Sequence, residues 1–183
     1  MLWSSCLAML AVGANGTAIM AALPTMQTEL FLSSAGVQWA VNAYLVVSAA
    51  CIVLGGQAAD RFGARLASMV GLALFGVASC IIAAAGTQTE LLAGRALQGL
   101  AAAFAVPSTL AAVDTSAAAE RRGAAIGAWT GFLMFGFSIG PLLGGALTHV
   151  TGWRVIFWLN VAAPSAQLGQ ARQRAHACYA GLV

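Results

Sequence analysis

The sequence contains no lysine and few charged residues of any kind. Its eight cationic residues are all arginine, its acidic residues number five, and charged residues make up 7% of its 183 residues. A soluble domain carries roughly 25% charged residues, so this composition excludes an ordinary soluble domain. The missing lysine also excludes a phosphate-binding loop, because the stretch from Gly94 to Gly99 is not followed by the lysine that such a loop needs.

Cysteine is scarce and irregularly spaced. The four cysteines are Cys6, Cys51, Cys80 and Cys178. No two of them have the short paired spacing of a zinc site or a disulfide framework. We therefore expect buried structural thiols, and we expect neither a metal nor a cofactor.

Long apolar runs fill the sequence between its few charges. Hydrophobic residues make up 61% of the chain, and its mean hydropathy is +0.88. A helix needs about 20 apolar residues to cross a bilayer, and the runs have about that length. We predict spans at residues 2–23, 37–58, 66–85, 91–113 and 124–147, followed by the start of a sixth at 153–163. The expected fold class is all-α, a polytopic transmembrane helix bundle held in a lipid bilayer.

Arginine is unevenly distributed between the predicted connections. Arg61 and Arg65 lie between the second and third spans, and Arg121 and Arg122 lie between the fourth and fifth. The positive-inside rule places these connections, and with them the N-terminus, in the cytoplasm. We therefore expect a multi-pass protein of the cell membrane, of the bacterial inner-membrane kind. The net charge of +3 then reports topology rather than nucleic-acid binding.

The connection between the second and third spans reads GQAADRFGAR. It joins two spans as a tight hairpin, and it resembles the G-x-L-A-D-R-x-G-R-K loop of the major facilitator superfamily of transporters. The residues in place are Gly56, Asp60, Arg61 and Gly63. Ala58 and Ala64 depart from the pattern, and Arg65 stands where the family has lysine. In the family this loop latches the two halves of the transporter, which implies that Asp60 engages a helix end in a C-terminal half that this chain does not contain.

The predicted fourth span contains a cation, Arg95, within LLAGRALQGLAAA. A cation there costs at least about 2.5–3.5 kcal/mol on insertion scales, so it needs a reason. Gln98 stands one turn away on the same helical face and would line the same polar path. Alternatively, Arg95 extends towards the membrane surface near Glu90 and keeps its charge in water. The stretch resembles the family pattern L-x-x-x-R-x-x-Q-G, met by Leu91, Arg95, Gln98 and Gly99, which ties the arginine to proton coupling.

The predicted fifth span, GAWTGFLMFGFSIGPLLGG, is rich in helix breakers. Lipid offers the backbone no hydrogen bonds, so the segment stays helical, and its small residues let neighbouring helices approach closely. We expect Pro141 to bend the helix. The run resembles the fifth-span motif of the antiporters of this superfamily, where it forms a leak-resistant, bendable interface at the centre of the transporter. The matching residues are Gly127, Gly136, Gly140, Pro141, Gly144 and Gly145.

The first span departs from the family at one position. The segments QWAVNAYLV and GWRVIFWLNV resemble the second-span and sixth-span openings of the fourteen-span drug:proton antiporters, but ANGTAIMAALP carries Asn15 where their first span has aspartate. Asn15 cannot exchange a proton near neutral pH, and no acid lies in the middle of a predicted span, so proton coupling needs carboxylates supplied elsewhere. Six polar residues in the spans have two alternative roles: they line a cavity, or they only form hydrogen bonds between neighbouring helices. They are Asn15, Thr17, Asn42, Tyr44, Gln98 and Ser108.

Two functional hypotheses follow. In the first, the chain is the N-terminal part of a transporter that exports small molecules, cationic or amphipathic, by secondary antiport, completed by self-association or by a complementing C-terminal half. In the second, it is an inactive membrane fragment or an assembly partner. Residues 164–183 form a polar ending without family resemblance, as from a frameshift or an early stop. The sequence GFSIG around Ser138 matches the G-x-S-x-G pattern of a hydrolase nucleophile elbow. That elbow needs a turn between a strand and a helix, whereas Ser138 lies in the middle of a predicted helix, so we expect no enzyme.

Overall fold

The computed structural model describes residues 2–161, and the described part contains helices and no strand. The helices are α1 (Leu2–Glu29), α2 (Ser34–Phe62), α3 (Ala64–Ala84), α4 (Gln88–Ser116), the short 3-10 helix η1 (Ala119–Arg121) and α5 (Arg122–Thr151). Residues 154–161 are also helical. Five helices are long and apolar enough to cross a membrane, which confirms the all-α fold class. The polar ending predicted at 164–183 lies outside the described residues.

Local hydrogen bonds mark where the helices begin. The Ser33 side chain accepts a bond from the Gly36 amide at the start of α2. At the start of α4, Thr87 and Glu90 form a reciprocal capping box, in which each side chain accepts from the backbone amide of the other. These caps satisfy amides that a helix start leaves without intrahelical partners.

The connection between α2 and α3 is shorter than predicted. Only Gly63 lies between the two helices, so Asp60 and Arg61 belong to the last turn of α2 rather than to a loop. The chain reverses at Gly63 because its φ is 90°, a value that costs glycine little and other residues much. No residue before Gly63 in this stretch forces the helix to end, so α2 continues beyond the predicted boundary at residue 58.

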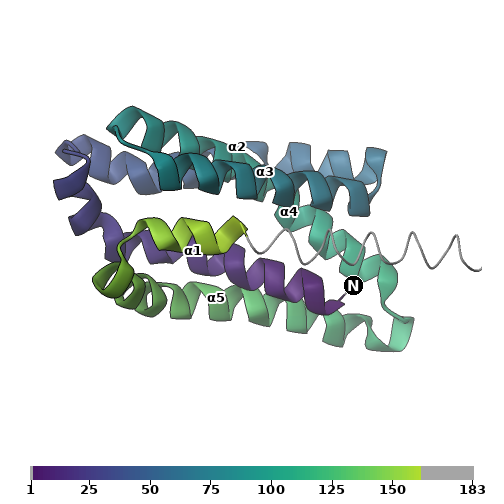
Figure 1. Cartoon of the computed structure of the whole chain (residues 1–183). Coiled ribbons are helices and arrows are strands. Elements are labelled where there is room, and N and C mark those ends of the chain that lie inside the picture. The colour runs from purple at the N-terminus through teal and green to yellow at the C-terminus, as the bar shows by residue number, and fades with distance from the viewer. Residues whose placement is uncertain (1, 162–183) are drawn as a thin grey trace, which may run out of the picture.

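The helices pack as two groups that meet through α4 (Figure 1). α1 packs along α5, while α2 and α3 both pack along α4. One buried cluster, which includes Ile19, Met26, Ile82 and Trp153, lies towards the end of the bundle that carries Glu29. A second cluster, which includes Phe75 and Trp129, lies towards the end that carries Gly63. We refer to these as the Glu29 end and the Gly63 end.

The helices differ in how much of their surface is buried. In the most apolar stretch of α2 and of α5, 17% of the residues are buried, against 50–56% in α1, α3 and α4. Many of the exposed side chains on α2 and α5 are large and apolar, among them Val53 and Leu142. An exposed apolar surface of this size needs a lipid or a protein partner.

Candidate functional site

The central polar feature of the bundle is Arg95 on α4. Its guanidinium is fully buried, so the structure excludes the alternative in which the charge extends to the membrane surface. Nε donates to the carbonyl of Ala40 on α2 at 2.8 Å, and Nη1 donates to Oε1 of Gln98 at 2.6 Å. Arg95 and Gln98 therefore lie on one face of α4, as the spacing predicts, and they also hydrogen-bond to each other.

The network extends from Arg95 into a third helix. Nε2 of Gln98 donates to Oγ of Ser79 on α3 at 2.8 Å, and Ser79 in turn donates to the carbonyl of Phe75. Two-sided pairing of this kind lowers the cost of a buried amide, because neither end is left without a partner. The chain of bonds joins α4 to α3, while the Arg95–Ala40 bond joins it to α2.

An aromatic ring takes the place of a counter-charge beside Arg95. The guanidinium carbon lies 4.6 Å from the centre of the Tyr44 ring, a geometry in which the ring face attracts a cation. Among the described residues, the buried charged side chains include no acid. Gly99 allows this approach of α4 to α2, because a side chain there would collide with the backbone of Tyr44. One nitrogen of the guanidinium, Nη2, is buried without a hydrogen-bond partner.

Asn15 lies at a different place, in a cavity bounded by α1, α5 and residues 154–161. The cavity measures about 240 Å³ and is lined mostly by apolar side chains, with Asn15 and Asn160 as its polar members. Nδ2 of Asn160 donates to Oδ1 of Asn15 at 2.7 Å, whereas Nδ2 of Asn15 is buried without a partner. This pair is neutral, so it binds by hydrogen bonds and not by charge.

The other predicted cavity residues lie in separate environments. Thr17 donates its hydroxyl to the carbonyl of Phe137 on α5 at 2.8 Å. Asn42 is exposed on α2, Tyr44 packs on Arg95, and Ser108 is buried with its hydroxyl unpartnered. The structure therefore does not gather these residues into one binding cavity.

The glycines of the predicted fifth-span motif fall into two sets. Gly136, Gly140 and Gly144 are buried on α5 against the backbone of α1, where an added side chain would collide. A methyl group added at Gly145 would meet only the side chain of Ala21 outside its own helix, and one added at Gly127 would meet nothing within 4 Å. The close-packed partner of this glycine face is thus α1 of the same bundle.

The predicted hairpin residues lie at the Gly63 end. Asp60, Gly63 and Arg65 line a cavity of about 480 Å³ together with the last turns of α4. Gly56 faces open space, because a methyl group added there would meet no other atom within 4 Å. At the same end, Arg122 at the start of α5 forms an ion pair with Asp114 on α4.

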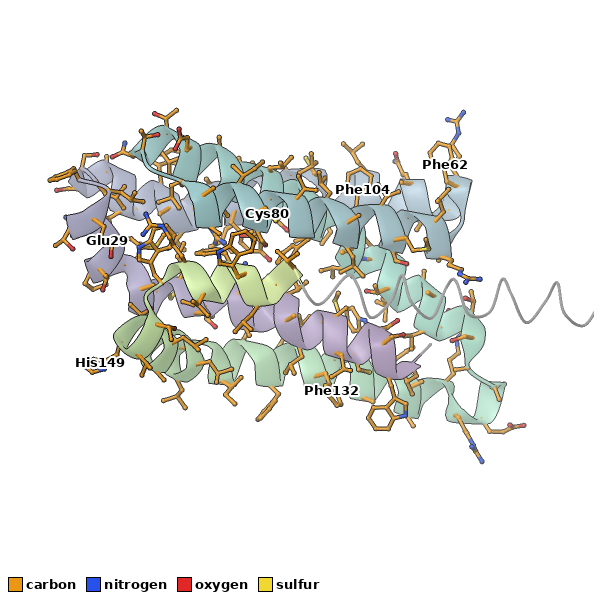
Figure 2. The ribbon with its side chains drawn as sticks, viewed as in Figure 1. Glu29, Phe62, Cys80, Phe104, Phe132 and His149 are labelled. Carbon is orange, nitrogen blue, oxygen red and sulfur yellow. The ribbon has the colours of Figure 1, made fainter. Side chains whose placement is uncertain are left out.

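The Glu29 end carries an ion-pair cluster that the sequence patterns did not predict. Oε2 of Glu29 accepts from Nε1 of Trp153 at 2.9 Å and from Nη1 of Arg154 at 2.7 Å. Nη2 of Arg154 also donates to the carbonyl of Ala85 at 3.3 Å. Figure 2 shows Glu29 and His149 towards this end of the bundle and Phe62 at the other. The cluster fastens α1 and the end of α3 to the chain after α5.

Two further polar residues of these networks were not predicted from the sequence. Ser79 and Asn160 partner Gln98 and Asn15 respectively. Each stands inside an apolar run, and a polar residue at membrane depth is itself a signal. The signal does not name the partner, because these bonds connect residues 19 and 145 positions apart.

Known proteins resemble this chain in both sequence and fold. Residues 5–164 match the family model described as Major Facilitator Superfamily. The methylenomycin A resistance protein of Bacillus subtilis is 37% identical over 153 residues, which cover 83% of this chain and 33% of that protein. The tetracenomycin C resistance and export protein of Streptomyces glaucescens is 35% identical over 150 residues, which cover 82% of this chain and 28% of that protein. The chain thus spans about a third of the length of these relatives.

Solved structures show the same fold at low identity. The peptide transporter POT has a TM-score of 0.79 and 19% identity, over 91% of this chain and 36% of its own. The proton:xylose symporter XylE has a TM-score of 0.79 and 17% identity, over 94% of this chain and 43% of its own. With a family model matched over most of its length and this helical architecture, the chain belongs to the major facilitator superfamily, whose members are multi-pass membrane transporters and not enzymes.

Proposed function

We propose that this chain forms the N-terminal helices of a small-molecule exporter of the cell membrane. The relatives that support the proposal are named for resistance or export, including the puromycin resistance protein of Streptomyces alboniger, which is 38% identical over 84% of this chain. The expected substrates are amphipathic or cationic small molecules.

The observation that carries the proposal is the buried guanidinium of Arg95. A fold that keeps a cation at this depth accepts a cost of several kcal/mol in lipid, and here no buried acid among residues 2–161 offsets it. Bonds to Ala40 and Gln98 use two of its nitrogens, and the N–H groups of Nη2 remain for a further acceptor. We infer that this acceptor comes from a substrate or from a complementing half when the helices move apart.

Proton coupling, in this proposal, does not come from α1. The buried pair there is Asn15 and Asn160, and neither amide titrates near neutral pH. Carboxylates for antiport would therefore be supplied by the complementing half. This half, or a second copy of the chain, would also cover the exposed apolar faces of α2 and α5.

The proposed orientation places the Gly63 end in the cytoplasm. Four arginines lie at that end, in or next to the short connections: Arg61, Arg65, Arg121 and Arg122. Arg154 lies at the Glu29 end, where Glu29 pairs with it. The positive-inside rule favours this orientation, and it puts the N-terminus on the cytoplasmic side of a bacterial inner membrane.

Reconstitution into liposomes tests the export function. The purified chain is incorporated at several protein densities, and the movement of a fluorescent cationic dye is followed. We expect dye movement that is lost in Arg95→Met, because that variant removes the buried cation. Arg121→Met serves as the matched control, since Arg121 is exposed and its loss removes one positive charge without touching the network.

The outcomes of this assay distinguish an exporter from an inactive fragment or assembly partner. Dye movement that depends on Arg95 and not on Arg121 supports export. If no protein density moves the dye, the chain alone is not an exporter, and the role of an assembly partner is favoured instead. Equal loss in both variants would contradict the role given to the buried network.

A further inference from the structure

Pro141 removes one hydrogen bond from the middle of α5. Proline has no backbone N–H, so the carbonyl four residues earlier in a helix loses its donor. In α5 that carbonyl belongs to Phe137. Inside a bilayer no water is available to replace the donor, so the freed carbonyl must find another partner within the protein.

Thr17 on α1 supplies that partner. Its Oγ1 donates to the Phe137 carbonyl at 2.8 Å. This bond crosses to another helix. The hydroxyls of Thr28, Thr109 and Thr115, by contrast, donate to carbonyls of their own helices. A threonine in a helix ordinarily bonds back in this way. Thr17 instead reaches the one α5 carbonyl that Pro141 leaves without its intrahelical donor.

Glycine makes the approach possible. A side chain at Gly140, directly before Pro141, would collide with Oγ1 of Thr17 and with the carbonyl of Ala14. On the other helix, a side chain at Gly13 would collide with the carbonyl of Leu133. The proline, the glycine before it and the threonine opposite thus meet at a single point between the two helices.

We infer that Thr17 is a positioning residue that completes α5 at Pro141 and so holds the proline hinge against α1. The bond replaces the missing helical bond while it lasts. When it breaks, α5 loses its anchor to α1 at the proline, and we expect the segment after Pro141, at the Glu29 end, to pack less firmly on α1. This inference rests on the contacts between α1 and α5 and stands whether or not the chain exports a substrate.

A double-mutant cycle separates this role from an ordinary helix-packing bond. Thr17→Val keeps the shape and removes the donor, whereas Pro141→Ala restores the amide that would bond the Phe137 carbonyl within α5. The full chain is melted in detergent micelles as the wild type, each single variant and the double variant. Thr17→Ser is included because it keeps the hydroxyl.

We expect Thr17→Val to lower the melting midpoint by about 2–4 °C, the shift for one lost hydrogen bond in a chain of this size. Thr17→Ser should recover most of that shift. With Pro141→Ala present, Thr17→Val should change the midpoint little, because the carbonyl then has its own helical donor. A shift from Thr17→Val that is equally large with and without Pro141 would overturn the inference.

Spin-label distances test the hinge with Pro141 left in place, so this second measurement does not depend on how the proline variant folds. One label pair sits towards the Glu29 end, at Met20 and Val150, and a control pair sits towards the Gly63 end, at Leu7 and Met134; all four side chains are exposed. We expect Thr17→Val to broaden the distance distribution of the first pair and to leave the control pair unchanged. Broadening of both pairs alike, or of neither, would contradict a hinge at Pro141.

Discussion

Arg95 shows how a single charge is kept inside a membrane helix bundle. Two of its nitrogens donate to Ala40 and Gln98, and its guanidinium stacks over the Tyr44 ring. These are oriented dipoles and a ring face, so the cation stays charged without an ion pair. The arrangement avoids the cost of burying a second charge in lipid.

The contribution of the ring can be measured by two substitutions at one position. Tyr44→Leu removes the aromatic face from a desolvated cation, which we expect to destabilise the chain by about 2 kcal/mol. Tyr44→Phe keeps the face and should cost less than about 1 kcal/mol. Unfolding of the purified chain in mixed detergent micelles gives both values. If the two variants are equally destabilised, the attraction between the guanidinium and the ring is not what holds Arg95.

At the residue scale, sequence reasoning worked where the partners are close in the chain. Arg95 and Gln98 are three positions apart, and helix geometry alone puts them on one face. Ser79 and Asn160 could not be assigned as partners, since their bonds cross between helices. Asn42 is exposed on α2, and apolar periodicity could not place it, because in lipid the outer face of a helix is as apolar as its packed face.

Glycine spacing governs how α1 and α5 pack. The residues at four-residue intervals, Gly136, Gly140 and Gly144, let the α5 backbone rest on the α1 backbone. The pattern predicted a smooth packing face, and the structure has one. The pattern did not reveal which helix packs against that face, since small residues permit an approach from any neighbour.

Two glycines of α5 provide a matched comparison. Gly144→Ala places a methyl group 2.8 Å from the Cα of Ala18, and we expect overpacking to destabilise the chain by about 1–3 kcal/mol. Gly127→Ala meets nothing within 4 Å, so it should be neutral or gain up to about 1 kcal/mol from helix propensity. The melting midpoints of the two variants, each compared with the wild type, measure this difference in stability. A Gly127→Ala variant that loses as much as Gly144→Ala would show that contact with α1 is not the reason for the glycine.

Helix boundaries were less predictable than helix identity. Hydropathy located each of the five helices, but it ended the second span at residue 58 where α2 continues to Phe62. Hydropathy follows the apolar core of the bilayer, whereas a helix continues through the headgroup region until a residue such as Gly63 turns the chain. The hairpin motif therefore lies mostly on α2 and not in a loop.

At the scale of the whole molecule, the two ends of the bundle differ in charge. The Gly63 end carries Arg61, Arg65 and Arg121, together with the ion pair between Arg122 and Asp114. At the opposite end, Glu29 joins Trp153 and Arg154 in one cluster. This asymmetry is the basis for the proposed orientation, and the alternation of five helices between the two ends is the basis for the membrane-spanning account.

Chemical labelling of single cysteines in intact cells tests that account most directly. In a background from which the native cysteines are removed, Ser34→Cys reports the Glu29 end and Ala119→Cys reports the Gly63 end; both positions are exposed. A maleimide that cannot cross membranes should label Ser34→Cys on intact cells and Ala119→Cys only after lysis. Labelling of Ala119→Cys on intact cells with Ser34→Cys protected would invert the proposed orientation, and equal labelling of both would contradict a bundle that spans the membrane.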